Sequence, residues 1–172
     1  MEWGQRIQQD NQNALQSLYQ PTGKRFERVE RKTITLDVTI GAVTTTFSKT
    51  LIEPFKIDKL CDVYLDSFVT FDSKNNKAAD QMAFLLGINE FSIQSNSNES
   101  KSFNKIVIPN TTTDAAGSTT NVHKGKKFNY ICSIKPTTLS SLNGTLTDLA
   151  GSTMGIDAHF RFIAELVFVP RD

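Results

Sequence analysis

The stretch that decides the fold lies at residues 158–170 and reads AHFRFIAELVFVP. Its apolar side chains recur at every second position: Ala158, Phe160, Phe162, Ala164, Leu166 and Phe168. The positions between them face the other way and include His159, Arg161, Glu165 and Val167. Because successive side chains of a strand point to opposite faces, this pattern predicts a β-strand with one face in the core, ended by Pro170.

Two earlier runs have the same period of two. Residues 33–40 read TITLDVTI, and residues 61–71 read CDVYLDSFVTF. In the second run we expect Cys61, Val63, Leu65, Val69 and Phe71 on an apolar face and Asp62, Tyr64, Asp66 and Thr70 on a polar face. A slip by one residue would turn each apolar set to solvent, so the register is well specified. Together the runs predict one core that contains Ile34, Leu36, Val38, Cys61, Val63, Leu65, Phe160, Phe162 and Leu166.

Turn signals and shorter apolar runs complete the strand pattern. Gly41 interrupts the alternation and predicts a hairpin or bent pair with the following run, which Pro54 ends. Asn143-Gly144 is the strongest short hairpin signal in the chain. Further strands are expected at residues 82–88, 91–93, 103–108 and 128–134, and residues 110–121 predict an exposed loop.

These runs amount to eight or nine strands, with loops between them and no convincing helix after residue 20. Without helical crossovers the strands must be mostly antiparallel. The length of 172 residues fits one domain with a core of its own. We therefore expect an all-β fold, a single antiparallel jelly-roll sandwich over residues 24–172, preceded by a short helical or extended arm over residues 1–23.

The arm differs from the rest of the chain because it is rich in Gln and Asn. Its apolar residues follow helical offsets until Pro21 and Gly23 give a stop signal, and residues 10–11 interrupt the stripe. Such a short helix is marginal in water without a surface to pack on. The arm is therefore either a disordered leader or a segment that docks on its own domain or on a neighbour. For docking on another chain, the candidate interface residues are Trp3, Ile7, Leu15, Leu18 and Tyr19.

Few residues could carry enzyme or metal chemistry. His123 lies in a lysine-rich loop and His159 on the outward face of the last strand, with no nucleophile motif near either. Cys61 and Cys132 fall on core-facing positions, where we expect buried, reduced and inert thiols. The sequence has no glycine-rich phosphate motif and no zinc-ligand spacing. We therefore expect no enzyme activity, no metal and no cofactor.

Charge and hydropathy narrow the possible partners. With 19 Lys+Arg against 18 Asp+Glu, the formal net charge is +1, so no nucleic-acid partner is expected. No apolar run reaches the ~20 residues of a membrane span. The first residues lack the basic and apolar regions of a secretory signal. We therefore expect the protein to be located in a reducing compartment, the cytosol or the nucleus.

Three blocks carry a resemblance to a known family: residues 51–68 (LIEPFKIDKLCDVYLDSF), 128–134 (FNYICSI) and 161–170 (RFIAELVFVP). In texture and order they resemble the strand blocks of small capsid proteins from large eukaryotic double-stranded DNA viruses. The resemblance implies a single jelly roll that serves as a penton or minor capsid protein, with no catalytic residues. It also implies assembly in the host cytoplasm into the virion capsid. The implied partners are the major capsid protein and copies of the chain itself, without a small-molecule substrate.

Two other functions stay open at this point. A lectin-like or receptor-binding jelly roll on a virion surface would contact its ligand through the loop at residues 110–121. A cupin-like enzyme would need clustered metal ligands, and the sequence offers two isolated histidines. The leading prediction is a structural capsid subunit that acts through interfaces in an icosahedral shell.

Overall fold

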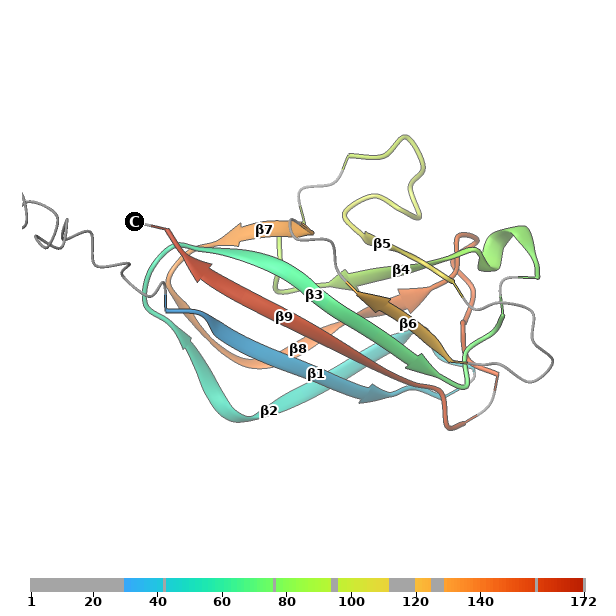
Figure 1. Cartoon of the computed structure of the whole chain (residues 1–172), viewed down its shortest axis with the longest axis horizontal. Coiled ribbons are helices and arrows are strands. Elements are labelled where there is room, and N and C mark those ends of the chain that lie inside the picture. Colours follow the sequence, from blue (N-terminus) through green and yellow to red (C-terminus); the bar gives the residue numbers. More distant parts are fainter. Residues whose placement is uncertain are drawn as a thin grey trace, which may run out of the picture.

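The described residues form nine strands in two antiparallel sheets that face each other (Figure 1). The computed structural model describes residues 30–41, 43–75, 77–93, 96–111, 120–124, 129–156 and 158–171. Sheet A contains β1 (Lys32–Thr39), β9 (Arg161–Pro170), β3 (Cys61–Phe71), β6 (Asn121–Lys124) and β7 (Tyr130–Ile134). Sheet B contains β2 (Thr46–Ile57), β8 (Thr137–Thr147), β4 (Ala83–Ile88) and β5 (Ile106–Pro109). The only helical element of the described residues is a short 3-10 turn, η1 (Ala79–Gln81).

The strands pair in a nested order that defines a jelly roll. The first strand pairs with the last, β1 with β9, and the second with the second-last, β2 with β8. Inside this frame β4 pairs with β5, while β6 and β7 pair with successive parts of β3 and together take the place of one strand. The orders β1-β9-β3-β6 and β2-β8-β4-β5 confirm the all-β antiparallel jelly-roll sandwich expected from the sequence.

The two sheets enclose one hydrophobic core. Near its centre Phe162 of β9 meets Phe47 of β2 edge to face, with the ring centroids 5.3 Å apart. Phe162 also stacks on Phe68 of β3, at 5.8 Å. Because Phe47 belongs to sheet B and the other two rings to sheet A, these contacts join the sheets. All the residues predicted for the core are buried in it: Ile34, Leu36, Val38, Cys61, Val63, Leu65, Phe160, Phe162 and Leu166.

The chain crosses from one sheet to the other after β1. The hairpin expected across Gly41 is therefore wrong, because β1 and β2 belong to different sheets. The backbone N–H of Thr44 donates to the Gly41 carbonyl (3.1 Å) where the chain turns. The expected end of the following strand at Pro54 is also wrong, because β2 continues to Ile57. Its register with β8 shifts between Thr50 and Phe55, so Pro54 lies in a bulge of the strand. A proline is tolerated at such a bulge on an edge strand.

A β-bulge in β3 reverses the faces expected for the second half of this strand. Its pairing with β9 shifts between Leu65 and Ser67, so one residue between them is extra. Residues before the bulge face the core as predicted. After it, Phe68 and Thr70 are fully buried, whereas Phe71 is 38% exposed on the outer face. The expected placement of Phe71 in the core and of Thr70 outside is wrong for this reason.

Strand β8 passes straight through Asn143-Gly144, so the hairpin predicted there is wrong. Gly144 lies opposite Phe47 of β2 on one side and Ile88 of β4 on the other. A Cβ atom at this position would collide with the Gly87 carbonyl group and would lie 2.7 Å from the Phe47 ring. The glycine therefore permits close packing inside a central strand and makes no turn.

Two runs near β5 are less regular than expected. Residues 91–93 form no strand, although Phe91 and Ile93 are buried in the core. Strand β5 begins at Ile106, and Phe103 lies in a turn with 48% of its surface exposed. Likewise β9 begins at Arg161 rather than at residue 158. Phe91 and Ile93 fill the core although their segment pairs with no strand. A sequence pattern with a period of two looks the same for such a segment as for a paired strand.

The two ends of the predicted exposed loop at residues 110–121 are buried. Asn110 donates to the carbonyls of Lys74 (3.1 Å) and Gln81 (2.9 Å), and Asn121 accepts a hydrogen bond from the backbone N–H of Thr111 (3.0 Å). Buried amides of this kind satisfy backbone groups that would otherwise lack partners. Residues 112–119 lie outside the described residues. The arm and its expected boundary at residues 23–24 also lie outside them.

Candidate functional site

The residues predicted as an interface are not among those that the structure describes, so that prediction stays open: Trp3, Ile7, Leu15, Leu18 and Tyr19. Of the two histidines, His123 lies on β6 opposite Phe68 of β3, and His159 is exposed just before β9. Within the described part of the chain, no group of three or more His, Cys, Asp or Glu side chains is placed to hold a metal ion.

Both cysteines are buried and form no disulfide, as predicted. Cys61 of β3 lies opposite Ile134, and Cys132 of β7 lies opposite Val63. Burial raises the pKa of Cys132 to about 11, and burial likewise raises the pKa of Cys61. Because the thiolate is the reactive form, a thiol with a raised pKa is a poor nucleophile. These two side chains contribute to the core.

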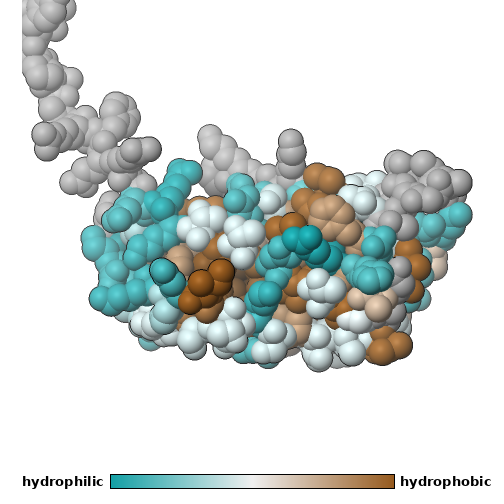
Figure 2. Space-filling view, turned by 90° about the horizontal axis from the view of Figure 1, so that it is seen from below, coloured by the Kyte–Doolittle hydropathy of each residue, from teal (hydrophilic) through white to brown (hydrophobic). Residues whose placement is uncertain are grey.

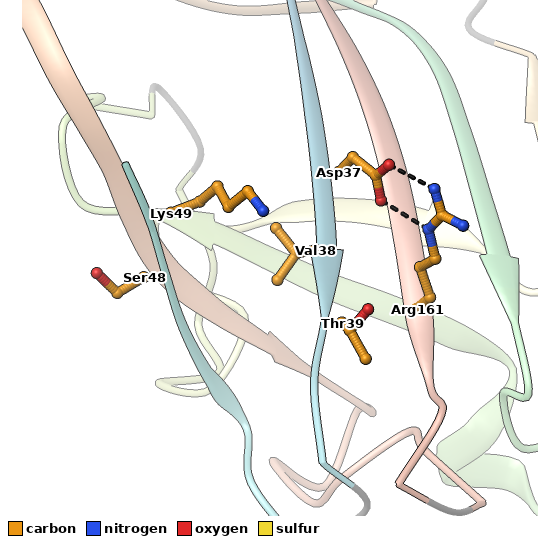
Figure 3. A pocket seen from close by; sticks show the side chains of 6 residues that line it. All are labelled: Asp37, Val38, Thr39, Ser48, Lys49 and Arg161. Carbon is orange, nitrogen blue, oxygen red and sulfur yellow. Dashed lines mark hydrogen bonds and ion pairs between the residues drawn. The ribbon is translucent and has the colours of Figure 1, made fainter. Parts of the chain in front are cut away.

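A hollow of about 410 Å³ lies between β1 and β2, at one edge of the sandwich (Figure 3). In it Arg161 Nε donates to Asp37 Oδ1 at 2.7 Å, and the guanidinium makes a second bond to the other carboxylate oxygen. This hydrogen bonding, with a smaller contribution from Lys49, lowers the pKa of Asp37. Arg161 is thus paired with a carboxylate of the protein itself. The hollow is lined by Asp37, Val38, Thr39, Ser48, Lys49 and Arg161.

The outer face of sheet A carries apolar side chains in bands across its strands. The even-numbered residues of β9 face the core, so its odd-numbered residues face outward, and the strand register shows which residues lie beside them. One band, the aliphatic row, contains Ile163, Val69 and Val122, of which Val122 is 55% exposed. Next to the aliphatic row, Phe71 of β3 lies opposite Arg161 of β9. The guanidinium carbon of Arg161 lies over the Phe71 ring, 5.9 Å from its centroid.

A second band, the tyrosine row, contains Val167, Tyr64 and Tyr130. The two tyrosine rings meet edge to face, with centroids 5.8 Å apart, and Tyr130 is 38% exposed. Between the two bands lies a polar row, in which the Ser67 hydroxyl donates to Glu165 at 3.1 Å. The outer face of sheet A is therefore apolar in two places, with a polar strip between them.

A cluster of polar side chains fixes one end of the tyrosine row. Asp62 of β3 accepts hydrogen bonds from Ser133 of β7 (2.7 Å) and from Arg171 Nε (2.9 Å), and the Tyr130 and Ser133 hydroxyls are 2.9 Å apart. The bond from Arg171 lowers the pKa of Asp62; partial burial opposes this effect, and Ser133 adds to it. The cluster ties β3, β7 and the segment after β9 together.

Sequence reasoning missed most of the outer-face rows. It placed Val69 in the core, because the bulge in β3 leaves no trace in the alternation. Tyr64 was correctly expected on the outward face, but no role followed from its position alone. The available signal was the apolar character of the outward positions of β9, where Ile163, Val167 and Val169 replace the polar residues usual on a solvated face.

Sheet B differs from sheet A because the segment just before β5 covers part of its outer face. Lys105 lies over Gly87 of β4, and its ammonium group contacts the Thr145 hydroxyl of β8. Burial there lowers the pKa of Lys105. At the other edge of the sheet, β2 lies lowest in Figure 1 and carries Ile52, which is fully exposed. On the face seen from below in Figure 2, hydrophobic residues appear in separate places among hydrophilic ones.

No protein-family model matches the chain, and a search of curated proteins found no match either. The fold and the outer face of sheet A are thus the basis for a functional proposal. Among the described residues, no helix is long and apolar enough to cross a membrane.

Proposed function

We propose that the chain is a structural subunit of a viral capsid, of the penton or minor capsid type, and that it works through protein–protein contacts. The observation that carries the proposal is the jelly roll whose sheet A presents two apolar rows on its outer face. Protein interfaces are enriched in Tyr and Arg relative to the rest of a protein surface. Tyr64, Tyr130 and Arg161 fit this composition.

The partners under this proposal are other capsid proteins, including the major capsid protein and copies of the same chain. The location is the virion capsid, after assembly in the host cytoplasm. A specific and stable interface buries about 1,200–2,000 Å², so the two rows and the arm would contribute together. The resemblance of three sequence blocks to the strands of small capsid proteins supports the same function.

The test is detection of the chain in purified virus particles from cells that express it. We expect its peptides at a fixed ratio to those of the major shell protein, and gold-labelled antibody on the shell. An abundant non-structural protein from the same cells is the matched control and should be depleted. Absence of the chain from complete particles would reject the proposal. Glycan binding by the purified chain without incorporation into particles would favour the receptor-binding alternative.

A further inference from the structure

We propose that the outer face of sheet A is the docking surface for the arm of a second copy of this chain, with residues 3–19 laid along β9 and β3. This inference rests on the proposed function, because it names the partner in one of the contacts of the subunit. Two observations support this occupant. The arm joins the body beside the surface, and its apolar residues match the spacing of the rows.

The described part of the chain begins next to the tyrosine row. Strand β1 begins at Lys32, and the following residue, Thr33, pairs with Val167 of that row. Strand β1 is an edge strand of sheet A, so the tyrosine row lies one strand in from the start of the described chain. Residues 20–29 separate the docking part of the arm, residues 3–19, from this point, and ten residues in extended form span at most about 33–36 Å. A connection of this length allows residues 3–19 to dock on an adjacent copy whose sheet A starts close to the same point.

The apolar pattern of the arm matches the two rows in spacing. In its helical form, one of the two forms expected from the sequence, the arm would have Ile7 and Leu15 about 12 Å apart, at about 1.5 Å per residue. Along β9, Ile163 of the aliphatic row and Val167 of the tyrosine row are about 13 Å apart, at about 3.3 Å per residue. The two apolar halves of the arm can therefore contact both rows at once. The polar gap at residues 10–11 then lies over the polar row.

Symmetry between two copies sets the direction of the arm. Each copy has the root of its arm and its tyrosine row at the same end of sheet A. A two-fold axis near this end lets the copies exchange arms reciprocally, so the same surface is used twice. The part of the arm nearest its root, including Leu18, then contacts the tyrosine row. Trp3 reaches Phe71 and Arg161, where its indole can stack and make a cation–π contact.

The experiment is a disulfide cross-link between two differently tagged full-length copies. One copy carries Leu18→Cys in the arm and the other carries Val167→Cys in the tyrosine row. Cys61 and Cys132 are buried, so the new thiols are the accessible ones. Thr50→Cys, at an exposed position on β2 of sheet B, replaces Val167→Cys as the matched control. Melting temperatures are measured first, to show that each variant is folded.

Mild oxidation should link the Leu18→Cys and Val167→Cys copies several-fold more than the control pair. Adding Trp3→Ala and Ile7→Ala to the arm copy should reduce the yield to that of the control. Equal yields for the two pairs would overturn the inference. A cross-link found only inside a single chain that carries both cysteines would also overturn it, since the arm then docks on its own body. Either result leaves the particle experiment untouched, so the inference and the proposed function fail separately.

Discussion

At the scale of single residues, Gly144 shows how the absence of a side chain sets the packing of a sheet. We expect Gly144→Ala to lower the free energy of unfolding by about 1–3 kcal/mol or more, because the new methyl group would collide with the backbone of Gly87. Gly41→Ala is the matched control, since the nearest atom to its Cβ would be Thr44 Oγ1 at 4.0 Å. Its effect should stay within about 0.5 kcal/mol. Chemical denaturation measures both, and equal losses would contradict the packing argument.

The two thiols make a second prediction at this scale. Cys61 and Cys132 should react slowly with a thiol reagent in the native protein and quickly in denaturant, because burial raises the pKa of each and limits access. Mass spectrometry of labelled peptides distinguishes the two sites. Glutathione at the same pH provides the rate of an accessible thiol. Native labelling of either cysteine at a rate near that of glutathione would show that the site is open.

At the scale of elements, the alternation of apolar residues predicted β1 and β9 well, because each has one face in the core throughout. It failed in the second half of β3, where one extra residue exchanges the two faces. It also failed at Asn143-Gly144, since a glycine required by a neighbouring strand looks the same in sequence as one required by a turn. Both errors arise from contacts between strands that are distant in the chain, which local patterns do not contain.

The polar cluster that joins β3, β7 and the segment after β9 should make stability depend on pH. The hydrogen bond from Arg171 holds the pKa of Asp62 in the folded protein below the ordinary value of an aspartate side chain. A carboxylate of this kind stabilises the fold above its unfolded pKa, and the contribution is lost as the pH falls through the folded pKa. Asp62→Asn should therefore lower the melting temperature at neutral pH, with a difference from the wild type that narrows below about pH 4.

The control for this measurement is Glu53→Gln, at an exposed position on β2. It should leave the melting temperature close to that of the wild type at neutral pH, since surface substitutions usually change stability little. A difference between Asp62→Asn and the wild type that stays constant from neutral pH to about pH 2 would show that the charge of Asp62 does not stabilise the joint.

At the scale of the whole molecule, the jelly roll followed from counting strands and excluding helical crossovers, whereas the candidate interface did not. The aliphatic row brings together Val122, Val69 and Ile163, which come from three separate strands. Only the register of β6, β3 and β9 makes them neighbours. A single sequence gives the faces of each strand but not which strands lie side by side, so a surface built across strands appears only once the sheet is assembled.

The arm provides the last prediction, which concerns assembly. Trp3→Ala combined with Leu15→Ala should leave the melting temperature of the body unchanged and reduce both self-association and incorporation into particles. The physical reason is that ordering the arm costs about 1–2 kcal/mol per residue, and under the proposal the burial of its apolar side chains on another chain offsets this cost. Gln12→Ala with Asn13→Ala is the matched control, since it changes polar residues of the same arm and should assemble normally. Sedimentation of the purified chains measures self-association, and calorimetry measures the melting temperature. If the body of the double variant unfolds while its remaining folded fraction assembles as before, the arm is an internal structural element and does not dock on another chain.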